Sequence, residues 1–281
     1  MAAFLASPLS MNSILALKLF LVPALIYAVT LAGRRWGPGV AGWLSAFPVV
    51  AGPILLAIAL EQGAPFAAAA AEGTLMAVLA IIVFSLAYAW ASGRWNVARA
   101  MPFALAAWAL AVAGLQSVRP ALPLAVLLVV AALFIAPRLF PALPAASAAP
   151  RPHAASAAAG AAAAARFGGD LPWRMLAGAV LVMSVSAAAA GLGPRLSGFL
   201  AMFPVMGTVL VGFTHVQSGR ASAVQLLRGT MLGYFAFAAF CLSIALLLRA
   251  QPVPVSFGAA FVFALTIQLL AKAASSKRRA T

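Results

Sequence analysis

The chain is built from long apolar runs separated by short polar or basic segments. A helix needs about 20 consecutive apolar residues to cross the hydrocarbon core of a bilayer. Runs of this length recur along the whole sequence, which predicts an all-α polytopic membrane protein with nine transmembrane helices. The predicted spans are 14–33, 40–60, 74–92, 101–118, 121–139, 172–191, 196–215, 230–249 and 255–273.

The composition excludes a soluble globular domain. Of the 281 residues, 65% are hydrophobic and only 7% are charged. A soluble domain is about half apolar and about a quarter charged. The surplus of apolar side chains is therefore expected to face lipid.

One internal segment lacks the large apolar side chains that packing requires. Residues 141–170 are rich in Ala, Pro and Ser, which is typical of a low-complexity linker. A second polar segment, 274–281, forms a basic tail at the end of the chain.

The basic residues are distributed unequally between the two predicted sides of the membrane. The chain has 18 Lys and Arg against 3 Asp and Glu. All but four of the basic residues fall on one side, the exceptions being Lys18, Arg119, Arg195 and Arg249. Lys and Arg accumulate in cytoplasmic loops. This predicts an external N-terminus, and a linker and C-terminus in the cytoplasm. Because the positive charge has this role, we expect membrane lipids and no nucleic acid as partners.

The sequence repeats itself at an offset of 156 residues. GPGVAGWLSAFPVVAG begins at Gly37, and GPRLSGFLAMFPVMGT begins at Gly193. From residue 37 to 74 there are 11 identities with the second copy, and only one of them is an alanine. The repeat predicts two four-helix halves, 14–118 and 172–273, joined by a connector helix, 121–139. Four spans and a connector make an odd number, so the second half enters the membrane in the opposite orientation.

The repeated motif places a proline in the middle of an apolar run. Pro48 and Pro204 lie about ten residues into their spans, where a proline removes a backbone hydrogen bond and interrupts the helix. Two helices interrupted near the midplane of inverted halves are typical of a transport site. A purely structural role of proline and glycine in helix packing is the alternative. The substrate-pathway candidates are Gly42, Phe47, Pro48, Gly198, Phe203 and Pro204.

Ionisable and amide side chains near the membrane form a second group of candidates. The coupling or gating candidates are Glu61, Glu72, Gln217, Arg228 and Gln268. A coupling proton on Glu61 or Glu72 is one hypothesis, and solvated helix ends are the other. Glu72 and Arg228 occupy equivalent positions in inverted halves, so we do not expect them to form a salt bridge. Gln268 is expected to donate an interhelical hydrogen bond, and His215 to be a packed or interfacial histidine.

Few residues are available for catalysis. The chain has three acidic residues, two histidines and one cysteine, and no nucleotide-binding loop or metal-ligand cluster is recognisable. We therefore expect no enzymatic activity, no metal and no cofactor.

The segment from Ser197 to Leu248, which begins SGFLAMFPVMGTVLVGFTHVQSG, resembles the small GlpM-like inner-membrane proteins. These proteins carry a similar L-x-x-F-P break followed by a polar turn and a long apolar helix. The segment from Gly37 to Trp90 is similar too, so the chain resembles a duplicated form. The resemblance implies a bacterial inner-membrane location, and it assigns no chemistry to the F-P positions.

These patterns predict a transporter that moves a small solute by alternating access at a midplane site. The inward-pointing helix N-termini favour an anion. The alternative is a non-catalytic scaffold subunit of a lipid or polysaccharide export or envelope complex. The partners expected for the transporter are a solute, lipids and a second copy of the chain.

Overall fold

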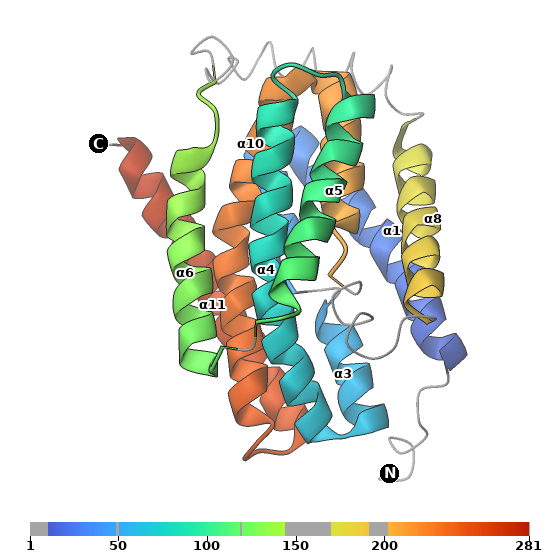
Figure 1. Cartoon of the computed structure of the whole chain (residues 1–281), viewed down its shortest axis with the longest axis vertical. Coiled ribbons are helices and arrows are strands. Elements are labelled where there is room, and N and C mark those ends of the chain that lie inside the picture. Colours follow the sequence, from blue (N-terminus) through green and yellow to red (C-terminus); the bar gives the residue numbers. More distant parts are fainter. Residues whose placement is uncertain (1–10, 49–50, 119, 144–169, 191–201, 281) are drawn as a thin grey trace.

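A computed structural model describes residues 11–48, 51–118, 120–143, 170–190 and 202–280. Every regular element in these ranges is a helix, which confirms the all-α prediction (Figure 1). The helices are α1 (Met11–Trp36), α2 (Pro38–Ser45), α3 (Ala51–Gln62), α4 (Ala64–Ala91), α5 (Val97–Leu115), α6 (Leu122–Leu139), α8 (Asp170–Ala190), α10 (Val205–Leu247) and α11 (Val253–Ala280).

Five helices in the described part of the chain are long and apolar enough to cross a membrane. They are α4, α5, α6, α10 and the Val253–Ala273 portion of α11. This supports a multi-pass membrane protein. The predicted span 40–60 is divided between α2 and α3, and the total of nine spans stays a prediction.

Two segments expected to be polar loops are helical instead. The sequence placed a loop between 60 and 74, yet α3 and α4 are separated only by Gly63. The second loop, expected between 215 and 230, is likewise reduced to Gly219 inside α10. Both glycines have positive φ, 89° and 81°, which turns the chain sharply at a single residue. Between these turns and the expected spans, residues such as the alanines at 67–71 favour helix.

The helix boundaries follow the 156-residue offset of the sequence. α4 starts after Gly63 and ends at Ala91, and the second segment of α10 starts after Gly219 and ends at Leu247. The next helices, α5 and α11, start at the equivalent residues Val97 and Val253. In these described segments, the two copies of the repeat therefore have helices with the same boundaries.

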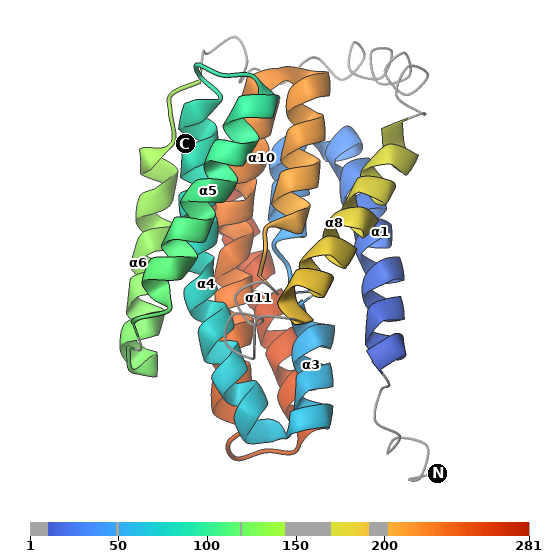
Figure 2. The same cartoon turned by 45° about the vertical axis from the view of Figure 1, so that its right-hand side comes forward.

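Equivalent helices run in opposite directions through the bundle. In Figures 1 and 2 the turn between α3 and α4 lies at the bottom, and the turn inside α10 lies at the top. α4 ascends from its turn, whereas the second segment of α10 descends beside it. α5 descends and α11 ascends in the same way.

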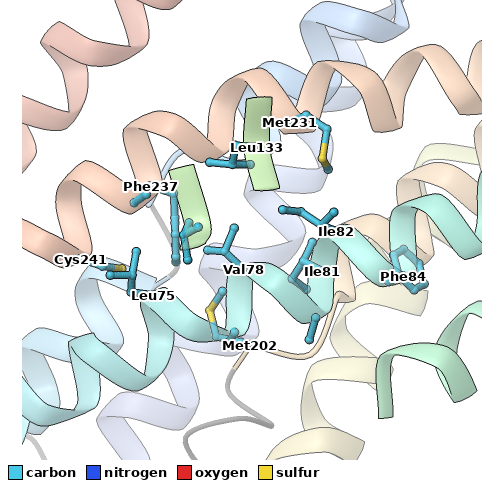
Figure 3. Close-up of a cluster of buried hydrophobic side chains, with 14 of the residues drawn as sticks. Leu75, Val78, Ile81, Ile82, Phe84, Leu133, Met202, Met231, Phe237 and Cys241 are labelled. Atoms are coloured by element: carbon cyan, nitrogen blue, oxygen red, sulfur yellow. The ribbon is translucent and has the colours of Figure 1, made fainter. Parts of the chain in front are cut away.

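The centre of the bundle is the contact between α4 and α10. Figure 3 shows Leu75, Val78 and Ile81 of α4 facing the α10 side chains Phe237 and Cys241 in one buried apolar cluster. α6 closes this cluster from outside. Most of the apolar residues of α5, α6 and α11 stay outside the core, and several of their large side chains are exposed, as expected of helices that face lipid.

Glycines bring α2 unusually close to the second segment of α10. A Cβ added to Gly42 would collide with the carbonyl oxygen of Leu226, and a Cβ on Gly229 would collide with the carbonyl of Gly39. A Cβ on Gly233 would lie 2.5 Å from the carbonyl oxygen of Trp43. Small residues on both helices allow this approach. Gly42 is therefore a helix-packing residue in this structure, while its predicted counterpart Gly198 lies outside the described residues.

One end of the bundle is basic and carries exposed tryptophans. The last turn of α1, the α4–α5 loop and the end of α6 meet at the top of Figure 1. These segments contain Arg34, Arg35, Arg94 and Arg138, together with the exposed Trp36, Trp90 and Trp95. Tryptophan gathers at membrane interfaces and arginine gathers on the cytoplasmic side. We refer to this end as the basic end.

We predict that Gly42→Ala destabilises the protein. The added methyl group would meet backbone atoms of α10, which cannot rotate away, so a loss of about 1–3 kcal/mol is expected. The measurement is thermal unfolding of the detergent-solubilised protein. Gly73→Ala is the matched control, because nothing lies within 4 Å of its added Cβ. Equal stability of the two variants would contradict the close packing of α2 on α10.

Candidate functional site

The first interruption lies between α2 and α3, as Pro48 predicts. A continuing helix would use the N–H of residue 48 to bond the carbonyl of Leu44, and proline has no N–H. Leu44 accepts from the N–H of Phe47 instead, at 3.2 Å. The Ser45 hydroxyl donates to the carbonyl of Gly42 at 2.8 Å. The end of α2 is thus closed by local bonds.

One carbonyl at this interruption is satisfied from another helix. The N–H of Phe47 is used by Leu44, so the carbonyl of Trp43 has lost its usual partner four residues on. Gln268 of α11 donates its Nε2–H to that carbonyl at 2.9 Å. The interhelical donor role predicted for Gln268 is confirmed. The amide is 2% exposed, so this bond is shielded from solvent.

The second F-P motif directly precedes α10, and we call it the second interruption because the sequence predicts a span from 196 to 215. Phe203 and Pro204 lie just before the first helical residue, Val205. The carbonyl of Pro204 accepts from the N–H of Thr208 at 2.7 Å, and in the first half the carbonyl of Pro48 accepts from Gly52 at 2.9 Å. Both α3 and α10 therefore follow a proline whose carbonyl accepts a hydrogen bond from the N–H four residues on.

The phenylalanine of each interruption packs on the last helix of the other half. Phe47 lies against Phe261 of α11, with ring centroids 6.5 Å apart. Phe203 meets Trp108 of α5 edge to face, with centroids 5.1 Å apart. The two interruptions are thus enclosed by aromatic side chains supplied by α5 and α11.

Buried polar atoms without a hydrogen-bond partner gather beside both interruptions. Seven such side-chain atoms occur among the described residues, and four of them adjoin the F-P motifs. At the first interruption they are Trp43 Nε1 and Gln268 Oε1. At the second they are Trp108 Nε1 and Thr208 Oγ1. A buried polar atom left without a partner is costly, so its presence calls for a functional or structural explanation.

The acidic candidate that the structure describes lies away from the interruptions. Glu72 is inside α4 rather than in a loop, and its carboxylate pairs with Arg249 at 2.5 Å. The side chain of Arg249 is 58% exposed and that of Glu72 is 32% exposed, so the pair is largely solvated and adds little stability. The other acidic candidate, Glu61, is the penultimate residue of α3, and its side chain lies outside the described residues.

Gln217 and Arg228 make structural contacts. Gln217 accepts a hydrogen bond from Arg174, a buried guanidinium of α8 that also lies over the ring of Phe213. Arg228 donates to the carbonyl of Pro141 at 2.9 Å, which fixes the end of α6 on α10. As expected, Arg228 and Glu72 do not form an ion pair.

One buried polar pair was missed by reasoning from the sequence. Tyr88 of α4 and His215 of α10 are hydrogen-bonded, with 2.7 Å between Oη and Nδ1. His215 packs against another helix, as expected, but its polar partner was not foreseen. The repeat could have pointed to this pair, because the equivalent positions in the other half, Ile244 and Ala59, are apolar.

Comparison with protein-family models, curated proteins and solved structures finds no match for this chain. The similarity to GlpM-like proteins stays a prediction from the repeated motif.

We predict that Gln268→Leu lowers the stability of the protein by about 1–3 kcal/mol, because the buried Trp43 carbonyl would lose its donor. Thr266→Val on the same helix is the control. Its hydroxyl is exposed and bonds only within α11, so a change below about 0.5 kcal/mol is expected. The loss of folded protein on heating in detergent measures both effects. If Gln268→Leu is as stable as the control, another group satisfies the Trp43 carbonyl.

Proposed function

We propose that this chain is a transporter of a bacterial inner membrane that moves a small solute by alternating access. In this proposal nine spans form two inverted four-helix halves, with α6 as the connector. The main support for the transporter proposal is the set of four buried polar atoms without hydrogen-bond partners beside the two F-P interruptions. Interrupted helices in inverted halves are where transporters of this architecture bind their substrates.

The opposite placement of equivalent turns supports the inverted arrangement. Gly63 and Gly219 are equivalent residues with nearly the same backbone angles. The turns that contain them lie at opposite ends of the bundle (Figures 1 and 2). The basic end, with its exposed tryptophans, is then the cytoplasmic side.

The groups at the interruptions favour a solute that accepts hydrogen bonds. Indole Nε1–H is a donor only, and each interruption has one such group without a partner. The helices α3 and α10 begin next to the prolines, so their N-terminal dipole ends add positive potential there. The three acidic residues of the chain, Glu61, Glu72 and Asp170, all lie outside the F-P motifs in sequence. A small anion or a neutral acceptor fits the two indole donors and the helix N-termini, and a donor group of the same solute would fit the Oε1 atom of Gln268.

The crossed packing of the two halves supplies a route for alternating access. Each interruption packs on the last helix of the other half, through Phe47 and Phe261 or through Phe203 and Trp108. A rocking motion of α4 and α5 against the second half, with α2 held on α10, would change the contact between Phe203 and Trp108. The solute site would then open to one side and close to the other.

A non-catalytic scaffold in an envelope complex is the second candidate. It is favoured by the aromatic packing at both interruptions, where Phe47 contacts Phe261 and Phe203 contacts Trp108. In that case the interruptions would only shape the bundle for contact with another subunit.

We predict that residues beside the two glycine turns face opposite sides of the membrane. Gln62 and Ser218 are exposed neighbours of Gly63 and Gly219, and the native Cys241 is buried. In intact cells, a membrane-impermeant maleimide should label Gln62→Cys and leave Ser218→Cys unlabelled until the membrane is permeabilised. Labelling of both cysteines in intact cells would eliminate the inverted topology.

We predict that the purified protein carries small solutes across liposome membranes. Uptake of radiolabelled phosphate, acetate and lactate, with glycerol as a neutral probe, is compared with empty liposomes. For the solute that is carried, Trp108→Phe should lower the rate on the order of tenfold, because it removes the donor and keeps an aromatic ring. Trp36→Phe, at an exposed tryptophan, should leave the rate unchanged. Absence of uptake for the whole panel by correctly folded protein would favour the scaffold.

A further inference from the structure

The contact between Tyr88 and His215 joins the two halves near the basic end. Tyr88 is in the last turns of α4, and His215 is near the end of the first α10 segment. Tyr88 is fully buried, and its ring and the imidazole meet edge to face at 5.9 Å. A second link lies beside them, where Arg220 donates to the carbonyl of Ala89 at 3.4 Å. The Tyr88–His215 bond holds α4 against the first segment of α10, and the Arg220 bond holds α4 against the start of the second segment.

This contact is absent from the other end of the bundle. The residues equivalent to Tyr88 and His215 are Ile244 and Ala59, which cannot form a side-chain hydrogen bond. The polar link therefore does not belong to the scaffold that the two halves share. It distinguishes the basic end from the opposite end, as expected of a group that acts on one side of the membrane.

Protonation of His215 would weaken the link. When the imidazole is neutral, the Tyr88 hydroxyl can donate to Nδ1. When it is protonated, Nδ1–H becomes the donor, and the tyrosine hydroxyl hydrogen needs another acceptor. Among the described residues, His215 is the hydrogen-bond partner of the Tyr88 hydroxyl. An unpartnered buried hydroxyl is unfavourable, so the closed contact loses stability when His215 takes up a proton.

The neighbouring positive charges also make protonation of His215 unfavourable in the closed contact. Arg220 donates to the carbonyl of Ala89, the residue after Tyr88, so its guanidinium would repel a second positive charge on the imidazole. Across α4 the group that faces His215 is Tyr88. Arg174, from α8, is bonded to Gln217 and lies over Phe213. None of these neighbours among the described residues is a carboxylate that would stabilise an imidazolium in the closed contact.

We infer that His215 is the proton-binding site of this protein, and that its bond to Tyr88 keeps the basic end closed while the imidazole is neutral. The inference rests on the proposed transport function, since it names the coupling ion for that function. Proton uptake by His215 releases α4 from the first α10 segment and opens a path toward the interruption at Pro204. Histidine suits this role because its charge changes near neutral pH.

The experiment measures the opening directly by cysteine labelling. Thr208 lies two turns before His215 on the same face of α10, and its hydroxyl oxygen is buried. The variant Thr208→Cys, in a Cys241→Ala background in inside-out membrane vesicles that present the basic end outward, is treated with an impermeant maleimide at about pH 5.5 and about pH 8. Because thiol reactivity itself depends on pH, each rate is divided by that of Ser218→Cys, whose side chain is exposed.

The normalised labelling of Thr208→Cys should rise about fivefold or more at the lower pH. Adding His215→Asn should abolish the rise, because asparagine can accept the tyrosine hydrogen bond and cannot be protonated. Adding Tyr88→Phe should give high labelling at both values of pH. A rise that persists in His215→Asn, or labelling that never changes with pH, would overturn the inference.

The labelling experiment tests His215 as the proton site separately from the transport proposal. Solute uptake with labelling that is independent of pH would leave the transporter intact and remove His215 as the proton site. Labelling that depends on pH and on His215, without uptake of any solute in the panel, would instead keep the proton-controlled contact and remove the transport function.

Discussion

The requirement that every backbone polar group inside a bilayer finds a partner governs this structure. A helix meets that requirement by itself, and a proline in its interior breaks it. At Pro48 the freed carbonyls are satisfied one by one: by Ser45, by a shifted bond from Phe47, and by Gln268 from α11. The last of these ties α11 to α2, so a local defect in one half becomes a bond between the halves. Without such partners the interruption would be too unfavourable to persist in a lipid environment.

The parts of the fold that depend on local backbone chemistry were predictable from the sequence. The apolar runs predicted a helical membrane protein. Pro48 marked the break between α2 and α3, and Pro204 marked the start of α10. The turns after residues 60 and 215 were predicted wrongly, because their polar residues were taken as evidence of long loops. A single glycine with positive φ, such as Gly63, is enough to reverse the chain, and the flanking polar residues then remain helical.

The contents of the candidate site were less predictable, because they depend on which helices meet. Gln268 was identified by its rarity in an apolar span. Trp108 and Tyr88 were not identified, since an aromatic residue in a membrane helix usually packs or faces the interface. Their importance comes from contacts with Phe203 and His215, residues roughly 100 positions away in the chain. The comparison of equivalent positions in the repeat carries the most information here: a polar residue in one half opposite an apolar residue in the other marks an asymmetric role.

The close packing of α2 against the second segment of α10 limits how these two helices can move. Gly42, Gly229 and Gly233 leave no space between the two backbones, so these helices are expected to move as one rigid body. The short helix α2 is encoded in the first half, but it would travel with the second. The rigid bodies that move are then not the same as the two copies of the repeat. The hinge between them lies at the Phe47-Pro48 peptide, where α2, which moves with the second copy, joins the rest of the first copy.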